Sequence, residues 1–216
     1  QTKVSFDEKR KLKFAIGHIA AKIRSQTDAA RHYQRKGIVL AGETLHKLEK
    51  SLRSAETSKT LEFLRGIEGD ASATWFALLG QILKKPWVFN KRVRRPPTDP
   101  VNALLSLGYS LLTTRAAAMC SAVGLEPNIG TLHEYRAGRP SLACDIVEPF
   151  RVPVVDRWVI QLCNQGKVQI KDFVNSEEGT RLTQGKFPVV LADWEQTWHN
   201  GGHFTALIET ISAIFP

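Results

Sequence analysis

The residues best suited to chemistry gather between His133 and Arg151. In this stretch the histidine is followed, across a loop that contains glycine and proline, by Asp145 and Glu148. These two carboxylates are three residues apart, so they share one face if the segment is helical. One imidazole nitrogen together with hard oxygen ligands suits a divalent ion such as Mn²⁺ or Mg²⁺. The spacing therefore predicts a candidate metal site.

Arginines accompany this candidate metal site. Arg136, Arg139 and Arg151 lie in the same stretch, and guanidinium groups bind phosphate oxygens through paired hydrogen bonds. The pattern fits a phosphate-bearing substrate. It also fits a simpler interpretation, in which acidic side chains near the start of a helix are stabilised by the helix dipole. Taken alone, the stretch favours the simpler interpretation.

Another carboxylate lies on the apolar side of an expected helix. Residues 58–83 repeat apolar side chains at steps of three and four, which predicts a helix, and Glu68 falls in this stripe between Leu64 and Ala71. A buried carboxylate is costly unless it is paired, protonated or bound to a metal. A slightly rotated helix, with Glu68 at the boundary of the stripe, explains the position without a site.

The composition indicates an anionic partner. The 216 residues include 30 Lys and Arg against 21 Asp and Glu, which gives a net charge of +9 and a pI near 9.6. Such an excess is typical of proteins that bind nucleic acid or an acidic membrane surface. It also occurs in proteins that are merely basic.

Basic residues are densest in segment 84–97, where they alternate with Trp87 and Phe89. Cationic side chains beside aromatic rings fit a nucleic-acid backbone and unstacked bases, although a solvated linker would have the same composition. The basic residues of this segment are Lys84, Lys85, Lys91, Arg92, Arg94 and Arg95.

The three cysteines, Cys120, Cys144 and Cys163, are odd in number and widely spaced. They fit neither a disulfide framework nor a zinc site, so we expect free thiols in a reducing, cytoplasmic compartment. The sequence shows no signal peptide and no apolar run long enough to span a bilayer, and we expect no membrane partner.

Helical patterns cover most of the chain and predict a mainly α, bundle-like fold in one domain. The helix expected over 100–124 should be central and buried, with Asp99 as its N-cap and Pro100 at its first position. In the first helix, the charged residues opposite the apolar stripe, Lys22 among them, are expected to face solvent. Helices are expected over 11–32, 45–52, 58–83, 100–124, 154–164, 189–198 and 203–214, with a small hairpin formed by 168–174 and 180–183.

Four segments, in order along the chain, resemble the motifs of one protein family. They are Glu-Gly-Asp-Ala-Ser-Ala-Thr-Trp-Phe at 68–76, the Arg-Pro-Pro-Thr-Asp-Pro stretch and the helix after it at 95–109, the histidine loop at 124–133, and the acidic segment at 138–151. Together they resemble the CRISPR-associated integrase family Cas1, which inserts new spacers into CRISPR arrays. The resemblance covers about residues 58–198, so we expect a single catalytic domain over 1–216 with an N-terminal helical part at 1–57.

The resemblance implies a metal-dependent DNA endonuclease and integrase. In the family reaction a 3′-hydroxyl of incoming DNA attacks a phosphodiester of the CRISPR repeat. The metal ligands of the family fall on Glu68, His133 and Glu148 of this sequence, and Asp145 is implied as a further catalytic residue that ligates the ion or supports a ligand. The implied cofactor is Mn²⁺ or Mg²⁺.

The same resemblance gives the basic residues a role. Arg139, between the histidine and the acidic pair, is expected to contact a phosphate of the DNA. The residues expected to hold the DNA backbone are Lys91, Arg92, Arg94 and Arg95.

The family carries an N-terminal β-rich domain that builds its dimer and helps to dock Cas2. Because this sequence opens directly in helical segments, we expect either an excised domain or a fusion to an upstream module such as a reverse transcriptase. The implied partners are protospacer DNA, the CRISPR repeat, Cas2 and, in the full-length protein, a second copy. Two alternatives stay open: a non-catalytic DNA-binding or assembly subunit of the same fold, and an unrelated helical phosphohydrolase.

Overall fold

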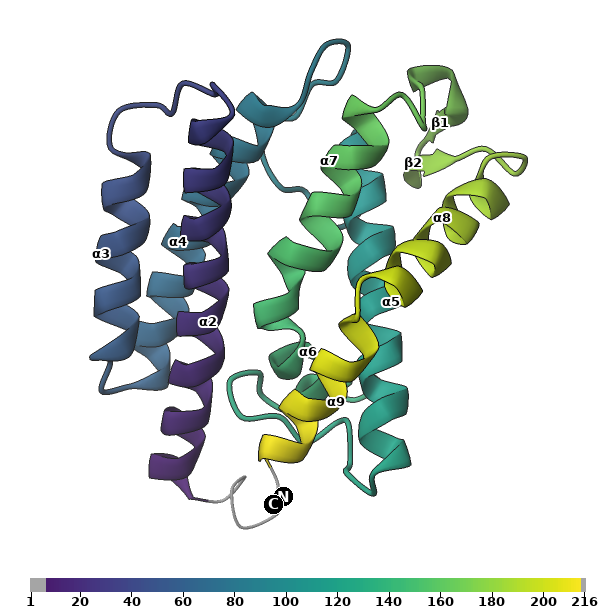
Figure 1. Ribbon diagram of the computed structural model, residues 1–216. Coiled ribbons are helices and arrows are strands. Elements are labelled where there is room, and N and C mark those ends of the chain that lie inside the picture. The colour runs from purple at the N-terminus through teal and green to yellow at the C-terminus, as the bar shows by residue number, and fades with distance from the viewer. Residues whose placement is uncertain (1–6, 215–216) are drawn as a thin grey trace.

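The structure, a computed structural model, describes residues 7–214 and is built almost entirely from helices (Figure 1). The predicted mainly α fold with one small hairpin is confirmed. In chain order the elements are α2 (Glu8–Arg35), α3 (Thr44–Glu56), α4 (Leu61–Ile82), α5 (Pro100–Ala122), α6 (Ser141–Ile146), the 3₁₀ turn η1 (Glu148–Phe150), the π-helical turn η2 (Arg151–Asp156), α7 (Arg157–Asn164), the 3₁₀ turn η3 (Ile170–Asp172), β1 (Phe173–Ser176), β2 (Gly179–Leu182), α8 (Phe187–Asn200) and α9 (His203–Ile214).

Helices α2, α3 and α4 pack against one another and form one side of the molecule (Figure 1). The α2 helix begins after Asp7, whose carboxylate accepts hydrogen bonds from the first-turn amides. The α4 helix begins after Thr60, whose hydroxyl oxygen accepts a hydrogen bond from the amide of Phe63. Their apolar stripes, which include Ile19 on α2 and Trp75 on α4, are buried in the core.

Helix α5 is the long buried helix that the sequence predicts. Asp99 caps it, with Oδ1 accepting a hydrogen bond from the Asn102 amide at 2.8 Å, and Pro100 occupies the first turn. Gly108 of α5 lets the next segment approach closely, because a Cβ there would lie 2.6 Å from Cγ1 of Val155 in η2. The absence of a side chain at Gly108 thus allows α5 to lie close to η2, the turn that follows the acidic segment.

The segment from α6 to α7 lies between α2 and α5 and contacts both. The expected helix over 154–164 is confirmed, whereas Asp145 and Glu148 do not belong to one α-helix. Helix α6 ends at Ile146 and a 3₁₀ turn begins at Glu148. Pro149 has no N–H to continue an α-helical ladder, which explains the break at this point. The two carboxylates consequently face different partners.

The C-terminal part adds the hairpin and two further helices. Strands β1 and β2 pair antiparallel, with Phe173 opposite Leu182 and Ser176 opposite Gly179. The hairpin is shorter than predicted, because residues 170–172 form a 3₁₀ turn. Helix α8 lies on the opposite side of the molecule from α2 (Figure 1). Its Trp194 is buried against Trp158 of α7, with ring centroids 5.1 Å apart.

The three cysteines are free, as predicted. Within residues 7–214 no helix is both long and apolar enough to cross a membrane. The division into a part at 1–57 and a core at 58–198 stays a prediction, although α2 and α3 of the first part pack directly on α4 of the second.

Candidate metal centre

Two of the predicted metal ligands meet at one ammonium group. Glu68 of α4 and Glu148 of η1 both form ion pairs with Lys22 of α2. Nζ of Lys22 lies 2.8 Å from Oε2 of Glu148 and donates a hydrogen bond to Oε1 of Glu68. The side chains of Glu148 and Lys22 are almost fully buried, whereas that of Glu68 is 23% exposed. Folding therefore gathers two carboxylates from separate elements around a single cation.

A second cation holds Glu148 from its other side. Nη2 of Arg151 lies 2.9 Å from Oε1 of Glu148. Burial alone raises the pKa of Glu148, but the charges of Arg151 and Lys22 outweigh burial and lower this pKa to about 2. Glu148 is therefore ionised at neutral pH. Its Oε2 atom is buried and receives no well-aligned hydrogen bond from any described residue, which leaves a lone pair available.

Asp145 supports the predicted histidine and does not face the glutamates. Its side chain is fully buried, and its Oδ1 atom lies 2.5 Å from Nδ1 of His133. An ionised carboxylate at this distance requires the proton of a neutral imidazole to be on Nδ1, so the lone pair of His133 is on Nε2. This is the arrangement in which a carboxylate orients a metal-ligating histidine.

The histidine loop wraps around the same carboxylate. Oδ2 of Asp145 accepts hydrogen bonds from the amides of Thr131 and Leu132 at 2.6 and 3.0 Å, and Oδ1 accepts one from the amide of His133 at 3.1 Å. Gly130 permits this approach, because a Cβ there would lie 2.9 Å from Oδ2. Asp145 therefore fixes the backbone of the loop as well as the ring of His133.

The donor types fit a divalent ion: two carboxylates and an imidazole nitrogen. His133 also contributes to the lowered pKa of Glu148, as expected of a neighbouring group. Among the described residues, however, no three His, Cys, Asp or Glu side chains are arranged as a ready cluster of metal ligands. Glu68 and Glu148 are both paired with Lys22 instead. The convergence of Glu68, His133 and Glu148 on one ion stays a prediction.

Next to this site lies a groove with a volume of about 660 Å³, which we call the arginine groove. Segment 92–95, helix α5 and segment 136–151 line it, and none of the described side chains that line it is acidic. Arg151 belongs both to the groove and to the ion pair with Glu148. The arginines that line the groove are Arg92, Arg94, Arg95, Arg136, Arg139 and Arg151.

The predicted DNA-binding residues differ in how exposed their side chains are and in how many hydrogen bonds they make within the protein. Lys91, Arg94 and Arg95 are exposed. Arg92 is partly buried and anchors its segment to α5, where Nη1 donates to Oδ1 of Asn102 and Nη2 donates to the Ser106 hydroxyl, both at 2.9 Å. Burial also lowers the pKa of Arg92. Its guanidinium is thus largely occupied by the protein itself.

Arg139 is partly occupied as well. Its Nη2 atom donates a hydrogen bond to the backbone carbonyl of Glu134, and Nε lies 3.3 Å from the Ser141 hydroxyl. These bonds hold the guanidinium at the wall of the arginine groove. The DNA contacts of all five basic residues stay predictions.

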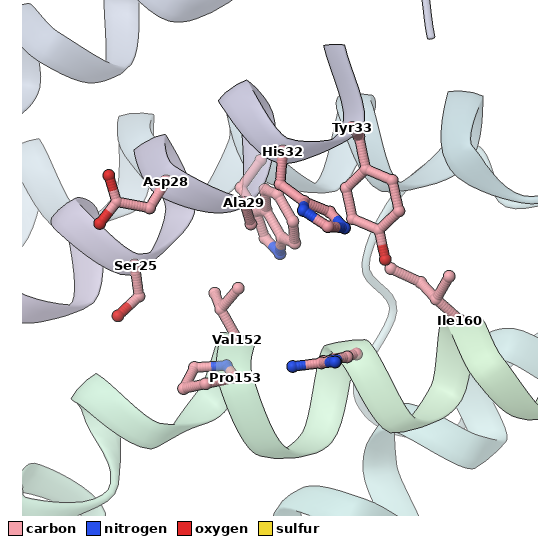
Figure 2. A pocket seen from close by; sticks show the side chains of 10 residues that line it. Ser25, Asp28, Ala29, His32, Tyr33, Val152, Pro153 and Ile160 are labelled. Carbon is pink, nitrogen blue, oxygen red and sulfur yellow. The ribbon is translucent and has the colours of Figure 1, made fainter. Parts of the chain in front are cut away.

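A second cavity, of about 300 Å³, lies between α2 and the η2–α7 segment. Figure 2 shows Ser25, Asp28, His32 and Tyr33 on α2, opposite Val152, Pro153 and Ile160 of the η2–α7 segment. The cavity contains none of the predicted site residues. Sequence patterns do not reveal it, because its two walls are far apart along the chain.

Lys22 is the site residue that the sequence analysis missed. The expectation that it faces solvent is wrong, because its side chain is only 5% exposed. The helical spacing of α2 indicates the burial of Lys22, because this residue is three residues after Ile19 and four before Gln26, and both of these are buried. It therefore falls on the inner stripe of α2.

Fold and site together define a helical protein with an acidic, histidine-flanked centre beside an arginine-rich groove. Residues 1–196 match the family described as CRISPR associated protein Cas1. The chain belongs to the Cas1 family.

Two relatives illustrate the extent of the match. The CRISPR-associated endonuclease Cas1 of Leptospira interrogans is 40% identical over 182 residues, which cover 81% of this chain and 71% of that protein. CRISPR-associated endonuclease Cas1 3 of Thermus thermophilus is 40% identical over 165 residues, which cover 74% of this chain and 50% of that protein. The chain thus spans about half the length of the Thermus relative.

Solved structures agree with this assignment. A CAS1 protein from Thermotoga maritima superposes with a TM-score of 0.85 at 26% identity, over 96% of this chain and 65% of that one. A chain of a partial Cas6-RT-Cas1–Cas2 complex gives a TM-score of 0.88 at 25% identity, over 98% and 66% of the two chains. A casposase bound to its integration product gives 0.78 at 26% identity, over 91% and 55%.

Proposed function

We propose that this chain is the catalytic part of a Cas1 protein, a metal-dependent DNA endonuclease and integrase of CRISPR adaptation. The observation that carries the proposal is the meeting of Glu68 and Glu148 in a mostly buried site, beside a histidine oriented by Asp145 and a groove lined by arginines. The relatives named as endonucleases and the casposase captured with an integration product support this reaction class.

Each residue of the site has a defined task in this proposal. Glu68, Glu148 and Nε2 of His133 would hold Mn²⁺ or Mg²⁺, which when bound stabilises the charged oxygens of a phosphodiester under attack. Asp145 orients His133 and keeps its lone pair on Nε2. Arg151 keeps Glu148 ionised and in place.

The arginine groove provides the DNA-binding surface of the proposal. Arg94 and Arg95, which are exposed, and Arg139 at the wall of the groove bind phosphates of protospacer and repeat DNA, because guanidinium groups pair with phosphate oxygens. A 3′-hydroxyl directed to the phosphodiester gives strand transfer, and water in the same position gives hydrolysis. One site thereby accounts for both integrase and nuclease activity.

The partners follow from the same family membership. We propose that the full-length protein acts with Cas2 and as a homodimer, and that a fusion to a reverse transcriptase is compatible with this chain. The similarity to a chain of a partial Cas6-RT-Cas1–Cas2 complex supports the proposals about Cas2 and the reverse transcriptase.

A nicking and strand-transfer assay on branched DNA tests the proposal. With Mn²⁺ the protein should nick and join DNA, and a chelator should abolish both activities. Glu68→Gln, His133→Ala and Glu148→Gln should each lower the rate at least about 100-fold while DNA binding persists. Glu62→Gln, an exposed change on the same helix as Glu68, is the matched control.

Two outcomes would contradict the proposal. Activity that survives the chelator would exclude the metal site. DNA binding without any cleavage or joining by the unchanged protein would favour the non-catalytic assembly subunit.

A further inference from the structure

Lys22 occupies the centre of the candidate metal site. Its side chain is 5% exposed, and a buried ammonium is costly unless it is paired. Lys22 meets this requirement through Glu68 and Glu148, which come from two other elements. With Arg151 on Glu148, this ion-pair group holds two negative and two positive side chains, so the charges of these four residues balance.

The ammonium engages oxygens that a divalent ion would need. Oε1 of Glu148 is paired with Arg151, and the other oxygen, Oε2, lies 2.8 Å from Lys22. Oε1 of Glu68 accepts hydrogen bonds from Lys22 and from the Ser72 hydroxyl. An ion shared by both glutamates would lie about 2.0–2.6 Å from their oxygens. The ion would therefore lie close to the place that Nζ of Lys22 occupies in the structure.

An ion and the ammonium would repel each other strongly in this site. Charges a few ångströms apart interact far more strongly in a buried environment than in water. The low exposure of Glu148 and Lys22 excludes the solvent that would screen them.

We propose that Lys22 is an internal cation that competes with the divalent ion for Glu68 and Glu148. This inference rests on the metal site of the proposed function. In the ion-free protein Lys22 holds the two carboxylates together across α2, α4 and η1. Ion binding displaces the ammonium from both carboxylates, so Lys22 preserves the site and lowers its affinity for the ion.

Mn²⁺ titration of the DNA-free protein by calorimetry tests this competition. Lys22→Met keeps much of the side-chain length and removes the charge, so it should bind Mn²⁺ at least about tenfold more tightly than the unchanged protein. Lys13→Met, an exposed change on the same helix, should leave the affinity unchanged. Equal or weaker binding by Lys22→Met would overturn the inference, and weaker binding would make Lys22 a support for the ligands.

A measurement on the unchanged protein keeps the test decisive if Lys22→Met fails to fold. Reductive methylation followed by mass spectrometry reports how accessible each lysine is. Without Mg²⁺, Lys22 should be labelled much more slowly than Lys13, and Mg²⁺ should speed the labelling of Lys22 alone. Continued protection of Lys22 at saturating Mg²⁺ would overturn the inference.

Glu148→Gln separates this inference from the proposed function. If Glu148→Gln still binds Mn²⁺ normally, or if the unchanged protein binds none, the metal site and the inference both fail. If Glu148→Gln loses binding but Lys22→Met does not tighten it, the metal site stands and only the role of Lys22 fails.

Discussion

Asp145 and Glu148 are two carboxylates only three residues apart, and their surroundings give them different tasks. Asp145 accepts hydrogen bonds from the histidine loop and from the His133 ring. Glu148 is held between Lys22 and Arg151, and these cations keep its pKa near 2 despite burial. The first carboxylate fixes the histidine loop, and the second is the one proposed to ligate the ion once Lys22 is displaced.

Asp145→Asn should damage both the fold and the proposed activity. An amide nitrogen replaces one acceptor oxygen, so at least one loop amide loses its partner, which costs about 1–3 kcal/mol of unfolding free energy. Misorientation of His133 should lower the Mn²⁺-dependent rate about 10–100-fold. Urea unfolding and the nicking assay measure the two effects.

Glu134→Gln is the control for Asp145→Asn, since Glu134 is exposed and its side chain pairs only with Arg65 among the ion pairs of the described residues. It should change stability by less than about 0.5 kcal/mol. Equal effects of the two substitutions would refute the role assigned to Asp145.

Asp156 should make stability depend on pH. Burial raises the pKa of this carboxyl from its ordinary 3.8 to about 6, although hydrogen bonds from Tyr109 and Trp75 oppose the rise. A raised folded-state pKa means that the protonated form favours folding. This contribution is complete below about pH 4 and is lost as pH rises through 6.

Measured by urea unfolding, the stability of the unchanged protein should therefore decline between about pH 4 and 6 relative to Asp156→Asn, by at most about 3 kcal/mol. The substitution removes the ionisable group while keeping its shape. Parallel stability curves for the two proteins across this range would show that Asp156 does not titrate as described.

The helices and caps that the sequence reveals are those whose signals lie close together along the chain. The cap at Asp99 and the start of α5 at Pro100 are predictable because a cap needs only its own helix. The break between α6 and η1 falls just before Pro149, and the three-residue spacing of Asp145 and Glu148 does not indicate it. Lys22 was missed because its partners lie on α4 and η1, and only tertiary packing brings these elements together.

The candidate ligands themselves came from the family resemblance, and spacing alone could not have selected them. Glu68 looked like a boundary residue of an apolar stripe, and it is indeed partly exposed. The proximity of Glu68 to Glu148 depends on how α4 packs against α2, which no local pattern contains.

Asn102 of α5 should hold the basic segment in position. Its Oδ1 accepts a hydrogen bond from the Val93 amide at 2.9 Å, its Nδ2 donates to the Lys91 carbonyl at 3.0 Å, and its side chain is fully buried. Asn102→Ala should cost about 1–3 kcal/mol and speed hydrogen exchange at residues 91–95. Exchange measured by mass spectrometry checks this expectation.

Ser110→Ala is the matched control for Asn102→Ala, because Ser110 is an exposed residue of the same helix whose hydroxyl donates to the Ser106 carbonyl of α5. It should leave the exchange of 91–95 unchanged. Unaltered exchange in Asn102→Ala would mean that other contacts fix the segment.

Across the molecule as a whole, the arginine groove and the candidate metal centre are adjacent. Arg151 joins them, because it lines the groove and pairs with Glu148. The net charge of +9 favours DNA at long range, and the groove concentrates that charge beside the carboxylates. A DNA strand in the groove would thus lie next to the residues proposed to act on it.

Removing exposed groove charges should change the salt dependence of DNA binding. Arg94→Ala with Arg95→Ala should reduce the slope of log affinity against log salt by about 2, because each phosphate contact contributes about 0.9. The control replaces Lys47 and Lys50, which are exposed on α3 away from the groove. Equal slopes for the unchanged protein and the arginine variant would mean that DNA binds elsewhere.

The most direct test of the proposed metal centre is an anomalous difference map from crystals grown with Mn²⁺. We expect one manganese peak with oxygens of Glu68 and Glu148 and Nε2 of His133 at about 2.0–2.6 Å, and with Nζ of Lys22 moved away from both carboxylates. A manganese ion bound elsewhere in the protein, or bound here without Glu68, would contradict the account.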